Sequence, residues 1–596
     1  MKYYLTGKQA QCIDKYTQET IGIPGLVLME KAAGVLADEI EKRINKNNFG
    51  EKFRSFDKNK DRILAVVESG NNGGDAVAAA WMLKERGYDT YIYEIGGLPK
   101  QTDSYKTEIQ KAIECGVGLL QKKSDEDPEK INPDEEFFDY RIIIDGIFGV
   151  GLTRGVKGVQ SKAIDMINAA GDNGSFIVGA DIPSGISSDT GHILGNAVKC
   201  DMTVTFEYTK YGMLLNEGRQ YSGDIKCESI GLYVPENVSE MAKLLEDGCV
   251  FMIDSKDSNI NKTAADNIYI CYEKEPEEIN SLIPGRKPDS NKGTYGKVLT
   301  VAGSKEIYGA VYMAAEAAYR VGAGLVKIVT DIRNRDILCD KLPEAMMLTY
   351  DTDKTGRGFE KDYIDSIKWA DVILAGPGLG TGKVSEKLLK ILSDNLSSGQ
   401  KLILDADALN IISMINPSKW FKLFTEKVGK GNVIITPHMM EMLRIVRAGY
   451  DKKTYDFMIQ NLGSKSEMDF LKDYRKSQTY SLSYNNGIIT VLKDARTVVA
   501  YKTDDESEIA AGYLRECPLY VNTTGNSGMS KGGSGDVLAG MIAGLLAQRK
   551  GEGISVADTV IAAVSLHGRA GDIARDRVGE RSMIARDILK AIPECF

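Results

Sequence analysis

Residues 63–87 read ILAVVESGNNGGDAVAAAWMLKERG, and this stretch decides the fold. It starts with an apolar run at 63–67, passes through a loop of glycine, asparagine and aspartate at 69–75, and continues into a helical pattern at 76–86. A continuous apolar run is typical of a parallel strand that is buried on both faces. Gly87 is a natural helix end. The stretch therefore predicts one strand–loop–helix unit of an α/β domain.

The same pattern recurs along the chain in two blocks. In the first block we expect further strands at 91–95, 142–144, 176–178 and 202–206. In the second block we expect strands at 298–302, 325–329, 372–375, 402–404, 433–436 and 488–492, and helices at 536–548 and 556–575. Between about 236 and 290 the pattern weakens and charged residues crowd in. We predict a doubly wound domain over 1–240, a linker over 241–280 and a second α/β domain over 281–596.

Composition narrows the class of protein. The 596 residues are 43% hydrophobic and 27% charged, which is typical of a globular chain and excludes a disordered or collagen-like one. The net charge of −9 disfavours a nucleic-acid partner. Nine cysteines without a C-x-x-C pair, together with only three histidines, argue against zinc or another transition metal. No apolar run is long enough for a membrane span and the start shows no signal pattern, so we expect a cytoplasmic protein with no membrane partner.

Three loops of the first block predict a ligand site. The loop at 69–75 offers glycines for close backbone approach and stands at a helix start, which suits a phosphate or a ribose, although a plain tight turn is the alternative. The loops at 144–154 and 180–185 place Asp145 and Asp181 at strand ends. The first of these two lacks the Rossmann dinucleotide fingerprint because Arg154 stands at its last position. In a parallel sheet all three loops meet at one edge, where ligands bind.

The sharpest signal of the second block is KGGSGDVLAG at 531–540. Its backbone amides can form an anion hole at the start of a helix, and Asp536 beside it can accept a hydroxyl proton. It is not a P-loop, and the near match at 377–384 fails as well; a plain helix-start glycine cluster is the alternative. Loops at 376–380, 404–410 and 436–438 each follow a strand. We expect His438 to contact a ligand, His567 to be structural and the acidic run 504–508 to be a solvated loop.

These motifs together resemble a known family. The first block is similar to NAD(P)H-hydrate epimerases, which are Rossmann-like, through GIPG at 22–25 with Met29-Glu30, and through the stretches 71–75, 145–155 and 181–185. The second block is similar to ADP/ATP-dependent NAD(P)H-hydrate dehydratases, which are ribokinase-like, through 292–297, 302–304, 376–380, 404–410, 436–438 and 532–540. The order of motifs over nearly the whole chain resembles bifunctional NAD(P)H-hydrate repair enzymes.

The resemblance implies repair of damaged cofactor. The epimerase interconverts the R and S hydrates of NADH and NADPH, and Asp181 is implied as its proton-transfer residue. A potassium ion is implied at Asn72, Asp145 and Ser184, which offer the hard oxygen ligands that such a cation prefers. The residues implied to contact the hydrate are Asn71, Asn72, Gly73, Gly74, Asp75, Gly149, Val150, Gly151, Leu152, Thr153, Arg154, Gly155 and Asp181.

The dehydratase is implied to restore the S hydrate at the expense of ADP or ATP with Mg²⁺. Asp536 acts as the base, the hydrate hydroxyl is phosphorylated, and elimination of phosphate restores the nicotinamide ring. The hydrate contacts implied here are Ala310, Gly378, His438 and Asp536. The nucleotide contacts implied are Lys493, Asp494, Ala495, Arg496, Thr497, Gly532, Gly533, Ser534 and Gly535. We expect a homo-oligomer.

Some residues differ from the family pattern, and two other functions are alternatives to this interpretation. Met439-Met440 stands where Pro-Gly is usual, and Asp494 replaces a glycine. We interpret the departures as drift, and the one at 494 is the most able to weaken nucleotide binding, because it adds an acid beside a phosphate-bearing ligand. Lys31, Ala76 and Asn291 are further departures. One rival is a ribokinase-class small-molecule kinase fused to a Rossmann-like domain, and the other is a non-catalytic nucleotide-binding module. The epimerase-like loops argue against the first rival, and the presence of both Asp181 and Asp536 argues against the second.

Overall fold

The computed structural model describes residues 1–46, 55–95, 101–120, 137–237, 240–241, 243–245, 269–286, 288–351, 357–449, 452–461, 466–473, 475–502, 517–549 and 553–596. It divides into two compact units. The first unit is Tyr3–Ile260, and the second is Asn261–Phe596 together with Met1–Lys2. Within the stretch expected to be a linker, β10 (Tyr269–Glu273) and α10 (Pro276–Ser281) are elements of the second unit, whereas residues 246–268 lie outside the described residues.

The first unit contains a parallel sheet in the order β4-β3-β2-β5-β6-β7-β9. The chain runs outward from β2 through β3 to β4, returns to β5 beside β2, and then builds the other half. This confirms the doubly wound arrangement and puts its switch point between β2 and β5. The strands are β2 (Arg62–Val67), β3 (Asp89–Glu94), β4 (Gly118–Leu120), β5 (Tyr140–Gly146), β6 (Phe176–Ala180), β7 (Met202–Phe206) and β9 (Asp224–Glu228).

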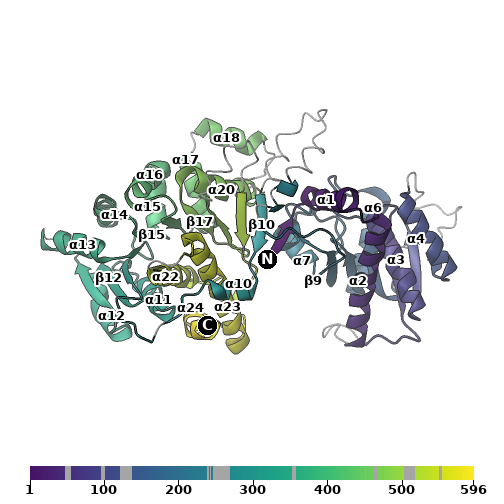
Figure 1. The fold of residues 1–596 in the computed structure, drawn as a ribbon, viewed down its shortest axis with the longest axis horizontal. Coiled ribbons are helices and arrows are strands. Elements are labelled where there is room, and N and C mark those ends of the chain that lie inside the picture. Colours follow the sequence, from purple (N-terminus) through teal and green to yellow (C-terminus); the bar gives the residue numbers. More distant parts are fainter. Residues whose placement is uncertain are drawn as a thin grey trace. The chain divides into compact units, whose positions relative to one another are not determined.

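Helices cover both faces of this sheet (Figure 1). α2 (Gly25–Asn45), α3 (Asn71–Glu85) and α4 (Asp103–Glu114) pack their apolar sides on one face, and α6 (Gly158–Asp172) packs on the other. Gly87 ends α3 with φ of 85°, as the sequence predicts. The remaining elements are β1 (Lys2–Leu5), α1 (Gly7–Tyr16), η1 (Thr17–Ile21), β8 (Thr209–Lys210), η2 (Tyr211–Leu214) and α7 (Asn216–Tyr221).

The sheet of the second unit runs in the order β13-β12-β11-β14-β15-β16-β17-β18-β19-β10. Its switch point lies between β11 and β14, because the chain builds outward from β11 in both directions. β18 is antiparallel to both neighbours, a hairpin-like insertion that parallel alternation does not predict. The strands are β10, β11 (Lys297–Val301), β12 (Leu325–Asp331), β13 (Met346–Tyr350), β14 (Val372–Ala375), β15 (Lys401–Leu404), β16 (Val433–Ile435), β17 (Ile489–Leu492), β18 (Val498–Ala500) and β19 (Cys517–Val521).

Helices also cover both faces of this second sheet. α13 (Arg357–Trp369), α14 (Lys383–Asn395), α15 (Asp407–Ile415) and α16 (Pro417–Val428) flank one side. The expected C-terminal helices are present as α22 (Ser534–Ala547) and α23 (Val556–Val578), and α22 packs on α11 (Gly309–Arg320). The others are η4 (Ile332–Asn334), α12 (Arg335–Lys341), α17 (Met439–Gly449), α18 (Lys452–Asn461), α19 (Glu467–Asp473), α20 (Arg475–Asn486), η5 (Ser527–Met529), α24 (Ala585–Ala591) and η6 (Ile592–Cys595).

Two expectations from the sequence concern a membrane span and the acidic run. Among the described residues, no helix combines the length and the apolar character that crossing a bilayer requires. The acidic run 504–508 lies outside the described residues.

Candidate active sites

The first unit contains a cavity of about 770 Å³ at the carboxyl ends of its central strands. It lies at the switch point, between the loops that follow β2, β5 and β6, where the sequence predicts a ligand site. Of the predicted contacts, Asn71, Asn72, Asp75, Gly149, Val150, Gly151, Leu152, Thr153, Arg154 and Asp181 line it. Side chains that the sequence interpretation did not include also line it, among them Gln11, Asp14, Leu28, Met29, Phe206 and Lys210.

Three predicted contacts are not among the residues that line this cavity: Gly73, Gly74 and Gly155. A Cβ on Gly73 would lie 1.7 Å from the Glu68 carbonyl oxygen, and one on Gly74 would lie 2.6 Å from the Met29 side chain. These two glycines therefore let α3 start tightly against β2 and α2. Their role in the described structure is packing, which glycine motifs alone do not distinguish from ligand contact.

A lysine–aspartate pair occupies the floor of the cavity. Asp181 has φ of 65°, unusual for a residue with a side chain, and its Oδ1 accepts hydrogen bonds from the Phe206 amide and the Thr205 hydroxyl, both at 3.2 Å. The Lys210 ammonium forms an ion pair with the same carboxylate, and the Lys210 side chain is only 4% exposed. The backbone strain thus turns the carboxylate into the cavity while a buried ammonium compensates its charge. The only sequence signal for Lys210 is a lysine within a run of aromatic and aliphatic residues.

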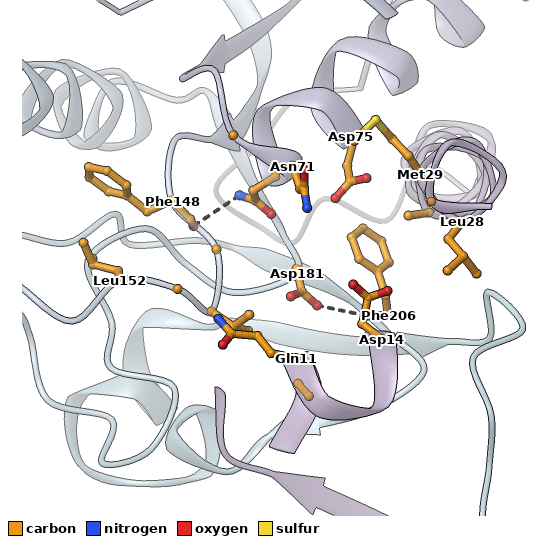
Figure 2. A pocket seen from close by; sticks show the side chains of 18 of the residues that line it. Gln11, Asp14, Leu28, Met29, Asn71, Asp75, Phe148, Leu152, Asp181 and Phe206 are labelled. Atoms are coloured by element: carbon orange, nitrogen blue, oxygen red, sulfur yellow. Dashed lines mark hydrogen bonds between the residues drawn. The ribbon is translucent and has the colours of Figure 1, made fainter. Parts of the chain in front are cut away.

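Two further acids face the same space, as Figure 2 shows for Asp14, Asp75 and Asp181. Burial, followed by the negative charges of Asp181 and Asp14, raises the pKa of Asp75 well above its ordinary value. Burial also raises the pKa of Asp14, which accepts a hydrogen bond from Gln18 at 2.9 Å. The cavity therefore sets an acid that tends to stay neutral beside a compensated carboxylate, the arrangement that acid–base chemistry needs.

The predicted potassium ligands lie together beside this cavity. Asp145 is buried; its Oδ1 accepts the Ser184 hydroxyl at 2.6 Å and its Oδ2 accepts the Ser184 amide at 2.8 Å. The Asn72 amide and the Ser184 hydroxyl both contact the Phe148 carbonyl oxygen, at 3.2 and 3.3 Å. Burial raises the pKa of Asp145 to about 6, and no described lysine or arginine forms an ion pair with it. A buried carboxylate among amide, hydroxyl and carbonyl oxygens fits a monovalent cation.

In the second unit the switch point brings Ala310 and Gly378 together. Gly378 has φ of 60°, and a Cβ there would lie 3.1 Å from the Ala310 Cβ and 2.6 Å from the Ile307 side chain. Ala310 lies in the first turn of α11, and the Gly380 amide is held by Asp407 at 2.8 Å. The loops after β11 and β14 therefore meet as the sequence predicts.

A chain of charged groups leads from this point to Asp536. The Lys493 ammonium lies 2.6 Å from the Asp405 carboxylate, which also accepts the Thr436 hydroxyl at 2.7 Å. Lys493 reaches α22, since a Cβ on Gly535 would lie 3.1 Å from its Nζ. Burial, followed by the charge of Asp405, raises the pKa of Asp536 to about 7, although Lys493 acts in the opposite direction. Asp536 can therefore take up a proton near neutral pH.

The two histidines of the second unit, His438 and His567, differ in exposure. His438 caps α17, because its Nδ1 accepts the amides of Met440 and Glu441 at 3.1 and 3.3 Å while its own amide donates to Glu441 at 2.8 Å. Its side chain is half exposed, so the ring edge remains accessible. The Met439-Met440 departure forms the first turn of α17. His567 is buried in α23, and burial lowers its pKa to about 4, in line with the expected structural role.

The predicted nucleotide stretch 493–497 lies against the loop that follows β19. Arg496 donates to the Thr523 carbonyl at 2.9 Å, and the Asn522 amide donates to the Thr497 carbonyl at 2.9 Å. The departure at Asp494 has a partner: Arg475 donates to its Oδ2 at 2.7 Å, and the Ala495 amide to its Oδ1 at 2.8 Å. The added charge is therefore compensated.

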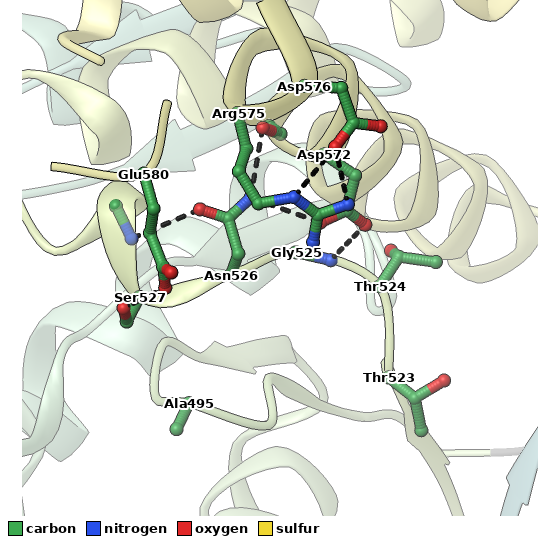
Figure 3. A network of polar contacts seen from close by, with 12 residues as sticks. Ala495, Thr523, Thr524, Gly525, Asn526, Ser527, Asp572, Arg575, Asp576 and Glu580 are labelled. Carbon is green, nitrogen blue, oxygen red and sulfur yellow. Dashed lines mark hydrogen bonds and ion pairs between the residues drawn. The ribbon is translucent and has the colours of Figure 1, made fainter. Parts of the chain in front are cut away.

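Figure 3 shows how α23 holds the loop at 523–527. Asp572 accepts the Gly525 amide at 2.8 Å and the Asn526 side-chain amide at 3.0 Å, and Arg575 lies 3.2 Å from the same carboxylate. The sequence interpretation did not include this loop, although glycine, asparagine and serine gather at 524–528 just before the 531–540 motif.

In the turn before α22, the backbone conformation and the close packing require a glycine at Gly533. Gly533 has φ of 97°, and a Cβ there would meet Met313 and Ala585. Gly532 faces open space and leaves its backbone accessible. Lys531 donates to the carbonyls of Arg581 and Met583 at 2.6 and 2.7 Å, so it fixes the turn. The helix start thus presents amides beside Lys493 and Asp536, which suits an anion.

A second cavity of about 650 Å³ lies elsewhere in this unit, between α16, α17 and α20. None of the predicted site residues is among those that line it. Among the described residues, no group of three or more His, Cys, Asp or Glu side chains is arranged to hold a metal ion.

Comparisons with known proteins agree with the division into two units. The family described as YjeF-related protein N-terminus matches residues 25–212, and the family described as NAD(P)H-hydrate dehydratase matches residues 298–594. The bifunctional NAD(P)H-hydrate repair enzyme of Thermofilum pendens is 28% identical over 99% of this chain and 95% of its own length. That of Coxiella burnetii is 30% identical over 88% of each chain. The solved ADP/ATP-dependent NAD(P)H-hydrate dehydratase of Bacillus subtilis, co-crystallized with ATP and Mg²⁺, is 25% identical, covering 54% of this chain and 96% of that one with a TM-score of 0.41.

Proposed function

The chain belongs to the family of bifunctional NAD(P)H-hydrate repair enzymes, and from this premise we propose that it repairs hydrated NADH and NADPH in two steps. The first unit epimerises the R and S hydrates. The second unit dehydrates the S hydrate at the expense of ADP or ATP. The observation that carries the second step is Asp536 at the start of α22, beside Lys493 and next to a glycine turn whose Gly532 is exposed.

Epimerisation requires a bond at the hydroxyl-bearing carbon to break and to re-form on the opposite face. Asp181, compensated by Lys210, is the base that takes the hydroxyl proton. As the carbon–nitrogen bond of the ring breaks and the hydroxyl oxygen becomes an aldehyde oxygen, Asp75, whose pKa is raised by burial, gives its proton to the ring nitrogen. Closure on the opposite face reverses both proton transfers, so that Asp75 and Asp181 return to their starting states. Both side chains line the cavity of about 770 Å³.

A potassium ion at Asn72, Asp145 and Ser184 would supply positive charge that the buried Asp145 carboxylate has no described residue to provide. Exchange of potassium for tetramethylammonium in the assay is expected to slow epimerisation. The same exchange is expected to have less effect in Ser184→Ala, because that variant removes one of the oxygen ligands. An equal effect in both proteins would remove Ser184 from the site.

Dehydration begins when Asp536 takes the proton of the hydrate hydroxyl. The hydroxyl oxygen then attacks the terminal phosphorus of the nucleotide, and the shorter nucleotide leaves. The backbone amides of 532–535 and the Lys493 ammonium stabilise the charge on the transferring phosphoryl group, with Mg²⁺ accompanying the nucleotide. Phosphate then departs with the electrons of the carbon–oxygen bond, and loss of a proton from the neighbouring ring carbon restores the carbon–carbon double bond of the reduced nicotinamide.

Product stoichiometry separates repair from the kinase rival. Repair with ADP releases one AMP and one inorganic phosphate for each reduced nicotinamide that is recovered, and phosphorus NMR of the reaction mixture measures all phosphorylated species. A phosphorylated product that persists, with no recovery of the reduced nicotinamide, would contradict the proposal and favour a small-molecule kinase.

Compartment and assembly are further parts of the proposal. Five cysteines whose side chains are described are free thiols: Cys115, Cys200, Cys227, Cys339 and Cys595. This favours a reducing compartment, so we place the reaction in the cytoplasm. Homo-oligomerisation stays a prediction, and sedimentation velocity of the full chain measures it.

A further inference from the structure

We propose that Asp405 is a positioning residue of the dehydratase site, which holds the Lys493 ammonium at the start of α22 and away from direct pairing with Asp536. The proposal rests on the function proposed for the second unit. Asp405 touches neither the glycine turn nor Asp536 through any described hydrogen bond, so it acts through Lys493.

The structure fixes Asp405 from several strands at once. Its amide donates to the Ala375 carbonyl of β14 at 3.1 Å, and its carboxylate accepts the Thr436 hydroxyl, from the residue after β16, at 2.7 Å. Its carbonyl oxygen lies so close to Gly376 that a Cβ there would approach it to 1.8 Å. The next residue, Ala406, has φ of 47°. Such strain in a residue with a side chain persists only where the surroundings over-determine it, often at functional sites.

The two acids on either side of the strained Ala406 have different partners. Asp405 points inward, is 1% exposed and pairs with Lys493 at 2.6 Å. Asp407 accepts the Gly380 amide at 2.8 Å, from the loop that follows β14. Lys493 is fixed at its backbone as well, since its amide donates to the Pro437 carbonyl at 2.8 Å. Both ends of the Lys493 side chain are therefore anchored, with the ammonium beside Gly535.

This placement has two consequences for the chemistry. A fixed ammonium at the glycine turn needs no reorganisation when charge develops on a phosphoryl group. In addition, an ammonium that is occupied by Asp405 leaves Asp536 free to accept a proton. The charged groups that face Asp536 are Asp405 after β15, Lys493 after β17, Asp407 on α15 and Glu441 on α17; the acids raise its pKa, and Lys493 lowers it.

The test uses the full-length Asp405→Asn protein, which keeps the shape of the side chain and loses its charge. We measure dehydratase kcat/KM against pH, separate KM values for nucleotide and hydrate, and ADP binding by calorimetry. The acid limb is expected to move down by about one pH unit, because the acid that repels the Asp536 charge is gone. The KM for nucleotide and the Kd for ADP are expected to rise about tenfold, as for loss of one charge-assisted contact, while the KM for hydrate changes little.

Two matched variants make the result specific. Thr436→Val removes the hydroxyl contact to Asp405 but no charge, so its acid limb is expected to stay at the wild-type pH. Lys493→Gln removes the cation that lowers the pKa of Asp536, so its acid limb is expected to move up. Thermal unfolding of each variant is the control for folding of the second unit, and epimerase activity on the same preparation is expected to stay at the wild-type level.

The outcomes are distinct. An acid limb that stays in place in Asp405→Asn, or moves in the same direction in Asp405→Asn and Lys493→Gln, would overturn the proposal. If Asp405→Asn does not fold, the other two variants decide: an acid limb that does not move up in Lys493→Gln, or that moves in Thr436→Val, would overturn the proposal. If the wild type binds ADP more tightly than Asp405→Asn but does not dehydrate the hydrate, the positioning role is retained and the proposed function is refuted. Wild-type protein that does not bind ADP would overturn both.

Discussion

The two candidate sites use the same pair of residue types in opposite ways. In the first unit Lys210 pairs with Asp181, the acid that faces the cavity. Burial raises the pKa of another acid there, Asp75, well above its ordinary value. In the second unit Lys493 pairs with the buried Asp405, and burial together with that carboxylate raises the pKa of the facing acid, Asp536, to about 7. The comparison teaches that the first partner of a buried lysine decides which nearby acid has its charge compensated.

The largest expected effect separates the sites completely. Asp536→Asn removes the base of the second unit and is expected to lower dehydratase kcat roughly a thousandfold, the usual contribution of a general base. Epimerase activity in the same protein is expected to be unchanged, because Asp181 and its cavity belong to the first unit. Rate assays of both activities on one preparation of Asp536→Asn, compared with wild type, measure the two effects. A parallel loss of epimerase activity would break the comparison.

The next effect tests the direct pairing in the first unit. Lys210→Met leaves the Asp181 charge without its buried counter-ion and is expected to lower the epimerase rate about a hundredfold. Lys226→Met is the matched control, since Lys226 is 38% exposed and pairs with Asp224. Chiral separation of the R and S hydrates over time gives the rate. Similar rates in both variants would show that Lys210 is not needed at Asp181.

The pH dependence of the two activities is expected to differ in sign. Asp536 works as a base, so dehydratase kcat/KM is expected to fall as pH falls through about 7, by about tenfold for each further unit. Asp75 works as an acid, so epimerase activity is expected to be lost as pH rises through its raised pKa. Rates over a series of buffers at constant ionic strength measure both. Limbs of the same sign would refute the assignment of base and acid.

The smallest effect concerns stability and uses two adjacent glycines. Gly73→Ala drives a methyl group into the Glu68 carbonyl and is expected to destabilise the first unit by about 3 kcal/mol. Gly74→Ala meets the flexible Met29 side chain and is expected to cost about 1 kcal/mol. Thermal unfolding, followed by loss of epimerase activity after heating, ranks them. The reverse order would return Gly73 to a ligand role.

The sequence was sufficient wherever function depends on residues that stand at strand ends. The doubly wound first sheet, Asp181 and Asp145 follow from apolar strands with polar glycine loops behind them, since parallel strands bring those loops to one edge. Asp536 follows from a different signal, the glycine cluster at a helix start. The antiparallel β18 does not follow from this logic, because three apolar residues carry no signal of strand direction.

Partners that meet only in the folded chain could not be predicted. Lys210 pairs with Asp181 across 29 residues, and Lys493 pairs with Asp405 across 88, so no spacing rule links them. The same limit hid Arg475, which pairs with Asp494, the added acid that was expected to bear on nucleotide binding. Gly73 and Gly74 show the converse: a glycine motif is the same whether its purpose is ligand approach or close packing of the backbone.

Recovery of absorbance at the reduced-nicotinamide band tests the central claim most directly. Wild-type, Asp181→Asn and Asp536→Asn proteins would each receive mixed R and S hydrates, potassium and Mg²⁺, with ADP and ATP supplied in turn. The account predicts full nucleotide-dependent recovery in the wild type, recovery of only the S fraction followed by slow spontaneous epimerisation in Asp181→Asn, and no recovery in Asp536→Asn. Absence of recovery in the wild type with either nucleotide would contradict it.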